Sequence, residues 1–236
     1  MIYLIATFIG ILPALVLLIF IYKKDRLQHE PWGWILKAFG FGMLSCIPAV
    51  IIENILPEMG ENNIFGSFYS AFFVASGTEE ALKLFMLWLL LKNNPHFDEH
   101  MDGIVYAACV SLGFACLENV GYMFNSLEDL ATVGLMRALI SVPAHFFFAV
   151  FMGYYYSLAA FGPESTRKRN YVLAFLIPFL WHGAYDFALM SMQIDTLTTI
   201  ISLIAIVVVC RLLWIYGKKK MNEMLEYDEK LGVGKQ

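Results

Sequence analysis

The sequence predicts an all-α protein, a polytopic transmembrane helical bundle with about seven spans. The chain of 236 residues is 59% hydrophobic and contains 20 phenylalanines, and only 15% of its residues are charged. Soluble domains carry about 25% charged residues, and a soluble protein of this length could not keep so much apolar surface out of water. The same composition excludes a disordered chain. A net charge of -4 without a basic stripe excludes nucleic acid as a partner.

Seven apolar segments are each long enough to cross a hydrocarbon core of about 30 Å at about 1.5 Å per residue. We expect these spans at residues 2–22, 33–56, 65–91, 103–124, 134–158, 171–191 and 197–216. The third carries charges well inside it, so it is either one helix or a helix broken near Ser76-Gly77. Residues 1–216 then form an integral membrane domain. The charged tail 217–236 is expected to be cytoplasmic, solvated and partly disordered.

The charges of the loops predict the orientation. The segments after the first, third, fifth and seventh spans contain the basic residues Lys23, Lys24, Arg26, Lys92, Arg167, Lys168, Arg169, Lys218, Lys219 and Lys220. The charged residues of the remaining loops are all acidic: Glu58, Glu61, Glu128, Asp129 and Asp195. By the positive-inside rule the basic segments are cytoplasmic. An odd number of spans then places the N-terminus outside and the C-terminus in the cytoplasm, as in a multi-pass protein of the cell membrane.

Ionisable residues inside the spans mark a functional site, because each charge near the bilayer centre costs about 2.5–3.5 kcal/mol on insertion scales. Once the loop and boundary charges are assigned, the remaining intramembrane residues are Glu79, Glu80, Lys83, Glu118, Arg137, His145, His182 and Asp186. Such residues must face one another or a water-filled cavity. Their depths in the antiparallel spans allow them to line one cavity that opens outward.

Helical spacing groups these residues further. The amine of Lys83 can reach Glu79 and Glu80, which precede it by four and three residues, and His182 shares a helix face with Asp186. Two adjacent carboxylates in a low-dielectric site suit a general base that must also act as an acid. A carboxylate four residues from a histidine can orient the ring. The set therefore predicts a water activated by glutamate and histidine, with or without a metal.

Structural roles stay open for some of these residues. Glu79 and Lys83 can form a purely structural ion pair. His145 follows Pro143 and can be a hydrogen-bonded residue of helix packing. Arg137 lies near the outer boundary, where its side chain can snorkel to the interface.

Three motifs resemble those of a known family. They are EExxK at residues 79–83, FxxxE at residues 114–118 and HxxxD at residues 182–186. Two further runs, residues 22–25 together with Glu30-Pro31 and residues 102–106, look like stretches that precede these motifs in that family. The order and placement of the motifs are similar to those of the PrsW family of bacterial intramembrane proteases. That family is distantly related to the CAAX prenyl endopeptidases.

The resemblance implies a membrane peptidase that makes the site-1 cut in a membrane-anchored anti-sigma factor, on its extracytoplasmic side, in stress signalling. The anti-sigma factor would be the substrate and protein partner, and the peptidase would be embedded in the lipid bilayer. Carried over motif by motif, the essential residues would be Glu79, Glu80 and His182. The supporting catalytic residues would be Glu118, His145 and Asp186. Related enzymes more often carry FxxxH, so Glu118 weakens the argument for a CAAX substrate.

The cofactor is expected to be either none or a divalent metal. Adjacent glutamates on one helix point about 100° apart, so only one of them is expected to aim at a shared ion. We therefore favour the metal-free mechanism. The chain has no HExxH motif, which a site-2 zinc peptidase requires.

Two other functions are considered. A proton-coupled membrane carrier would use the same buried Glu, His and Lys residues as a relay, but the inverted repeats typical of carriers are not evident. A non-catalytic scaffold would not need four carboxylates inside the membrane.

Overall fold

The computed structural model describes residues 1–57, 59 and 63–234, and these residues form helices without a single strand among them. This confirms the all-α prediction. The helical segments are α1 (Ile2–Lys24), α2 (Trp32–Ile55), α3 (Ile64–Tyr69), η1 (Ser70–Ser76), α4 (Gly77–Leu91), α5 (His100–Asn125), α6 (Leu130–Met136), η2 (Arg137–Ser141), α7 (Val142–Phe161), α8 (Glu164–Ser191) and α9 (Thr196–Leu231). The segments η1 and η2 are π-helical.

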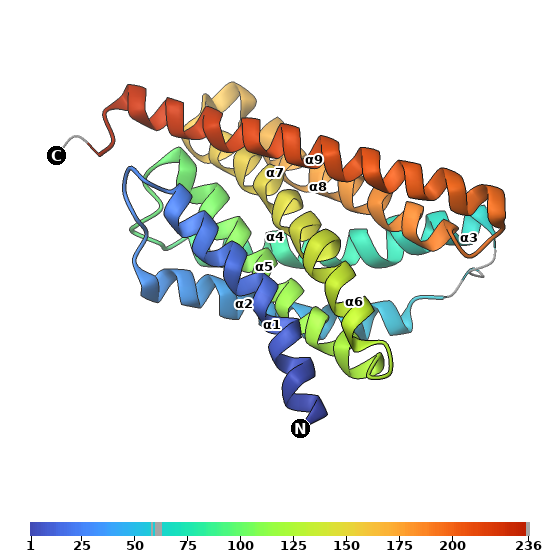
Figure 1. Cartoon of the computed structure of the whole chain (residues 1–236). Coiled ribbons are helices and arrows are strands. Elements are labelled where there is room, and N and C mark those ends of the chain that lie inside the picture. Colours follow the sequence, from blue (N-terminus) through green and yellow to red (C-terminus); the bar gives the residue numbers. More distant parts are fainter. Residues whose placement is uncertain (58, 60–62, 235–236) are drawn as a thin grey trace.

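The helices run back and forth between two ends of the molecule (Figure 1). Within the described ranges, six helices are long and apolar enough to span a membrane: α1, α2, α5, the continuous α6–η2–α7, α8 and α9. The predicted third span corresponds to α3, η1 and α4, which follow one another without a break. At Ser76-Gly77 the chain therefore changes from π- to α-helix and does not break. The protein is a multi-pass membrane protein. Glu58 and Glu61 of the acidic loops lie outside the described residues.

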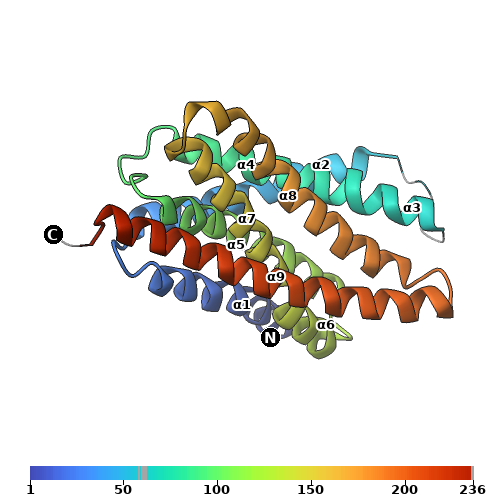
Figure 2. The same cartoon turned by 90° about the horizontal axis from the view of Figure 1, so that it is seen from above.

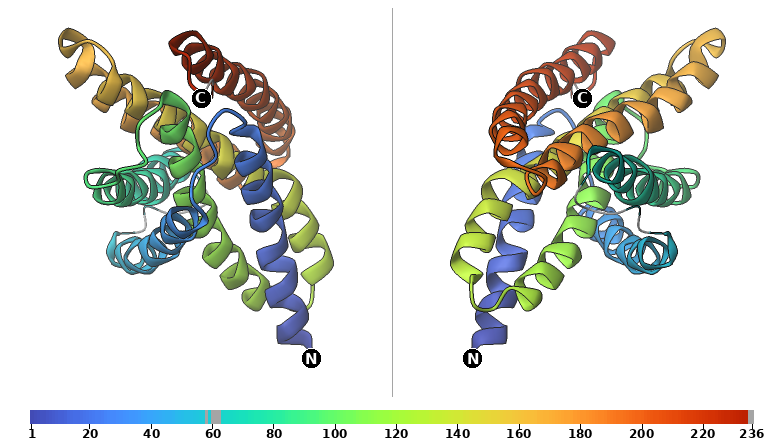
Figure 3. Two further views of the ribbon diagram at one scale, coloured as in Figure 1. Left: turned by 90° about the vertical axis from the view of Figure 1, so that its left-hand side faces the viewer. Right: turned by 90° about the vertical axis from the view of Figure 1, so that its right-hand side faces the viewer.

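Helix α5 is the centre of the bundle, and every residue from His100 to Cys116 is buried. It packs mainly against α7, α2 and α1, and Figures 2 and 3 show α5 and α7 between α9 on one side and α2 with α4 on the other. Close crossings depend on glycine. A Cβ at Gly113 would overlap the backbone of α2, and one at Gly153 of α7 would overlap the backbone at Gly103. Small residues of this kind let membrane helices approach closely.

The outer helices present apolar side chains, as a lipid-facing surface requires. Exposed residues along α1 include Leu4, Phe8 and Val16, and along α9 they include Ile204 and Val207. Lipid tails are as apolar as these side chains, so their exposure carries no penalty inside a bilayer.

Helix α9 continues 15 residues beyond the predicted end of the last span, from 216 to Leu231. Met221, Met224, Leu225 and Asp228 are buried there against the rest of the molecule. The expectation of a solvated and partly disordered tail is therefore wrong for residues 217–231. The buried residues recur at helical spacing on one face, so this face packs on the bundle while the opposite face stays polar.

Candidate active site

Two π-helical segments lie directly before residues of the predicted site. η1 ends at Ser76, three residues before Glu79, and η2 ends at Ser141, four residues before His145. Both are tied to α8. The Ser76 hydroxyl donates to a backbone carbonyl of α8 at 2.7 Å, and the hydroxyls of Ser141 and Tyr185 lie 3.0 Å apart. Single π-helical turns are frequent at functional sites. Here they fix how α4 and α7 face α8.

The glutamate pair shares the ammonium group of Lys83. Its Nζ donates to Oε2 of Glu79 at 2.8 Å and to Oε1 of Glu80 at 2.9 Å. Lys83 is fully buried, and Nζ lies 4.1 Å from the ring centroid of Phe114. An aromatic face stabilises a cation in this position. The EExxK and FxxxE motifs therefore meet through this lysine.

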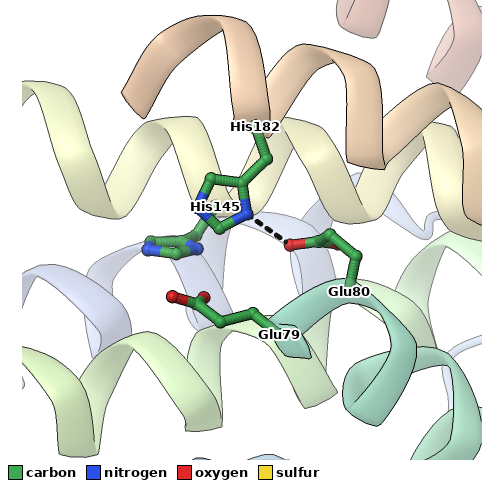
Figure 4. Close-up of side chains that lie close together, drawn as sticks. All are labelled: Glu79, Glu80, His145 and His182. Atoms are coloured by element: carbon green, nitrogen blue, oxygen red, sulfur yellow. Dashed lines mark hydrogen bonds and ion pairs between the residues drawn. The ribbon is translucent and has the colours of Figure 1, made fainter. Parts of the chain in front are cut away.

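The two histidines complete the cluster from α7 and α8 (Figure 4). Nδ1 of His182 lies 2.9 Å from Oε1 of Glu80, and its Nε2 lies 3.1 Å from Oδ2 of Asp186. Asp186 thus faces the far nitrogen of the ring, as the HxxxD spacing predicts. Nδ1 of His145 lies 3.2 Å from Nζ of Lys83. The two imidazole rings are 5.1 Å apart between centroids.

Glu118 lies beside this cluster and is held by two side chains. Nη2 of Arg137 donates to its Oε2 at 2.6 Å, and Nε2 of His145 lies 3.2 Å from the same oxygen. Arg137 also donates through Nε to Asn119 at 2.6 Å, and Asn119 donates to the backbone carbonyl of Gly10 at 2.8 Å. Arg137 therefore points into the bundle, and the alternative of snorkelling is wrong.

A cavity of about 920 Å³ opens beside the cluster. The predicted site residues that line it are Glu79, Glu118, Arg137, His145, His182 and Asp186. Its far part is lined by Glu53, Asn125 and Gln193, which lie at or beyond the ends of α2, α5 and α8. The cavity thus runs toward the end of the molecule opposite the basic loops. Most of the predicted residues share this one cavity, whereas Glu80 and Lys83 do not line it.

Four of these residues could hold a metal. Glu79, Glu80, His145 and His182 each present one ligand atom, these atoms lie within 4.8 Å of one another, and all four residues are buried (Figure 4). Catalytic zinc sites use three ligands of these kinds and a water, so the donor set fits a divalent metal. Both glutamates approach the histidines. The angular offset of adjacent glutamates therefore does not by itself favour a metal-free mechanism, although the Lys83 ammonium group hydrogen-bonds both carboxylates and would have to move for one ion to bind them both.

Sequence reasoning missed the hydroxyl groups that position the site. Ser76, Ser141 and Tyr185 join the π-helical segments to α8. Serine and threonine inside a membrane span commonly bond across helices, so their presence near the motifs was the available signal. Their partners come from other helices, and spacing along the chain cannot identify them.

Comparison with known proteins agrees with the motif resemblance. The family described as "PrsW family intramembrane metalloprotease" matches residues 30–214. Protease PrsW of Clostridioides difficile (strain 630) is 36% identical over 232 residues, which cover 96% of this chain and 94% of the relative. Protease PrsW of Bacillus subtilis (strain 168) is 39% identical over 184 residues, with 78% and 82% covered. No solved structure matches the chain. The chain is therefore a peptidase and belongs to the PrsW family of intramembrane metalloproteases.

Proposed function

We propose that this peptidase makes the site-1 cut in a membrane-anchored anti-sigma factor, on its extracytoplasmic side, in a stress-signalling pathway. The direction of the cavity supports this. It runs away from the basic loops, and the positive-inside rule places those loops in the cytoplasm and the N-terminus outside. A substrate with one membrane span would then present its extracytoplasmic boundary at the cavity.

The observation that carries the mechanism is the different placement of the two glutamates. Glu79 lines the cavity beside His145 and His182, whereas Glu80 is fully enclosed behind it. We therefore assign the general base to Glu79. It takes a proton from water, and the water oxygen bonds to the carbon of the scissile peptide group. The C–N bond then breaks, and Glu79 returns the proton to the leaving amine.

The other residues position this chemistry. Glu80 holds Nδ1 of His182, and Asp186 holds the opposite nitrogen. His182 and His145 line the cavity, and a ring N–H that turns there from its present partner can stabilise the negative charge that develops on the carbonyl oxygen. Glu118 faces His145 and is itself fixed by Arg137.

Three of the four donors, Glu80, His145 and His182, would hold the family's metal, and Glu79 beside them would stay free to act as the base. A divalent metal bound there supplies Lewis-acid polarisation of the peptide carbonyl and of water. The same cluster would also serve the rival proton-coupled carrier. Membership in a protease family makes the peptidase the better supported function.

Cleavage in proteoliposomes tests this proposal. The purified protein is mixed with a single-span anti-sigma factor, and the products are sized and sequenced by mass spectrometry. We expect one cut on the extracytoplasmic side, and no cut with Glu79→Gln. An unrelated single-span protein serves as the control substrate. Equal cleavage of that control would overturn the proposed substrate, and a cut on the cytoplasmic side would overturn the proposed orientation.

A further inference from the structure

A second cluster of acidic side chains lies at the opposite end of the bundle from the cavity mouth. Asp25 and Glu30 lie in the connection between α1 and α2, and Asp102 lies in the first turn of α5. Each presents one carboxylate oxygen, and these three oxygens lie within 4.8 Å of one another. In Figure 1 this connection passes close to the start of α5 at the end where the C-terminus lies. The cluster joins two sequence runs, 22–31 and 102–106, that the proposed reaction does not use.

Several oxygens of the cluster have no hydrogen-bond partner among the described residues. Neither oxygen of Asp25 makes a hydrogen bond of good geometry, although its side chain is completely buried, and its polar neighbours are the backbone of Glu30 and the carboxyl group of Glu99. Asp102 is also completely buried. Its Oδ2 accepts two backbone N–H groups at 2.9 Å, whereas Oδ1 has no partner. Glu30 accepts a hydrogen bond from the hydroxyl of Tyr106. Buried oxygens without partners need a ligand or a proton, because an unpaired buried charge is very costly.

The nearest basic side chains do not neutralise the cluster. Lys24 and Arg26 flank Asp25 in the chain, but both side chains bond to α9. Lys24 donates to Asn222 and Arg26 pairs with Glu229. The positive charges of Lys24 and Arg26 are therefore directed away from the three carboxylates, and His96 is a further basic side chain close enough to act on Glu30.

The pKa values of the carboxyl groups in the connecting segments agree with a missing positive charge. Burial, followed by the charge of Glu30, raises the pKa of Asp25 to about 7. Burial also raises the pKa of Glu30. Glu99, directly before α5, has its pKa raised to about 8 by burial and then by the charge of Asp25. Removing these groups from water without a cation therefore disfavours their ionised forms.

We propose that Asp25, Glu30 and Asp102 bind one hard divalent cation, Ca²⁺ or Mg²⁺. Carboxylate oxygens are the ligands that these ions prefer, and neither histidine nor cysteine belongs to the set. Metal–oxygen distances of about 2.0–2.6 Å place opposite ligands about 4–5 Å apart, so three oxygens that lie within 4.8 Å of one another can share one ion. The cation ties the connection between α1 and α2 to the first turns of α5, the central helix. Its role is structural and distinct from the peptidase centre.

Cation binding to the purified full-length protein tests the proposal. Terbium serves as the probe for a calcium-type site, because Tyr106 contacts Glu30 and can excite a bound terbium ion. We expect one terbium ion per chain, displaced by CaCl₂ or MgCl₂, and the more effective salt identifies the preferred ion. Thermal unfolding is followed in parallel, and the preferred ion should raise the midpoint by several degrees.

Matched variants distinguish binding at the proposed cation site from binding elsewhere on the protein. Asp25→Asn keeps the size of the side chain and removes its charge, so the variant should fold and bind the cation at least tenfold more weakly. Glu164→Gln on the exposed start of α8 should leave binding and thermal unfolding unchanged. Asp102→Asn provides a second loss-of-binding variant. No calcium or magnesium effect on the parent protein would overturn the proposal. The proposal would also be overturned if calcium or magnesium stabilised Asp25→Asn and Asp102→Asn as much as the parent protein. The carboxyl groups would then be neutralised by protons.

Discussion

Glu79 and Glu80 are neighbours in the chain but meet different surroundings. Glu80 is completely enclosed between Lys83 and His182, whereas Glu79 keeps 7% side-chain exposure on the cavity wall. Glutamine at either position keeps the shape and removes the charge. We expect both variants to lose cleavage by about 100-fold or more. Glu80→Gln should also destabilise the fold by about 1.5–3 kcal/mol, because it removes one of the two carboxylates that hold Lys83 and one of the two that hold His182.

The loss of catalysis and the loss of stability are separated by measuring cleavage and thermal unfolding on the same preparations. A Glu79→Gln variant that unfolds at the parental temperature but does not cleave supports a base at that position. A Glu79→Gln variant that cleaves at the parental rate would remove Glu79 from the mechanism. Glu80→Asp should recover part of the stability, since it restores the charge within the enclosed cluster.

In the proposed mechanism Glu118 acts through His145, and its contribution to catalysis should be smaller than that of Glu79. Its Oε2 faces Nε2 of His145 and accepts from Arg137. We expect Glu118→Gln to lower kcat about tenfold with little change in KM, because the histidine ring loses its partner while the cavity keeps its shape. The same loss in kcat as for Glu79→Gln would show that Glu118 takes part directly. Steady-state kinetics with a peptide substrate provides the measurement.

At the residue scale, the sequence predicts which polar residues gather but not how they are connected. The cost of charges inside a membrane singles out eight ionisable residues, among them Glu79, Glu80, His145 and His182. Their mutual distances depend on the packing of α4 against α7 and α8, which no spacing along the chain contains. Glu79 and Glu80 both lie in the α-helix α4, so the offset of about 100° holds for their backbone directions, and their flexible side chains bring one carboxylate oxygen of each near the histidines.

At the scale of the elements, α9 caps the start of α5. Oδ1 and Oδ2 of Asp228 accept from the backbone N–H groups of His100 and Met101 at 3.0 and 2.8 Å. A carboxylate stabilises the N-terminus of a helix in this position. We expect Asp228→Ala to lower the free energy of unfolding by about 1.5–3 kcal/mol per charged hydrogen bond removed, as judged by thermal denaturation in detergent.

Glu226 provides the matched control for this cap, because it lies on the same turn of α9 and its side chain is exposed. Glu226→Ala should change stability by less than about 0.5 kcal/mol. If the two substitutions lowered the free energy of unfolding equally, the hydrogen bonds of Asp228 to the start of α5 would contribute no stability beyond that of one negative charge in this part of α9.

The last part of α9 also shows where the sequence pattern was misread. The Lys-rich run 218–220 ends the apolar span, and charge alone predicted a solvated tail. Met221, Met224 and Leu225 repeat at helical spacing within that tail, and this weaker pattern was the correct signal for a packed helix. The cap formed by Asp228 joins residues 128 positions apart, which only the fold can bring together.

At the scale of the whole molecule, the orientation rests on the positive-inside rule. Among single-cysteine variants in whole cells, Glu128→Cys and Ile194→Cys should react with an impermeant thiol reagent from outside. Gln28→Cys and Thr166→Cys should not react until the membrane is opened. Cys210 is only partly buried, so it is replaced by serine beforehand. Labelling of position 166 from outside would reverse the orientation and place the cavity on the cytoplasmic side.

The central claim is that Glu79, Glu80, His145 and His182 form the metal-dependent peptidase centre of this bundle. Zinc content and cleavage of a single-span substrate, measured on the same purified samples before and after chelation, test it most directly. We predict about one zinc per chain, cleavage that is lost on chelation and restored by zinc, and neither zinc nor cleavage in His182→Ala. Cleavage at the full rate by protein free of zinc and other divalent metals, or by His182→Ala, would contradict the claim.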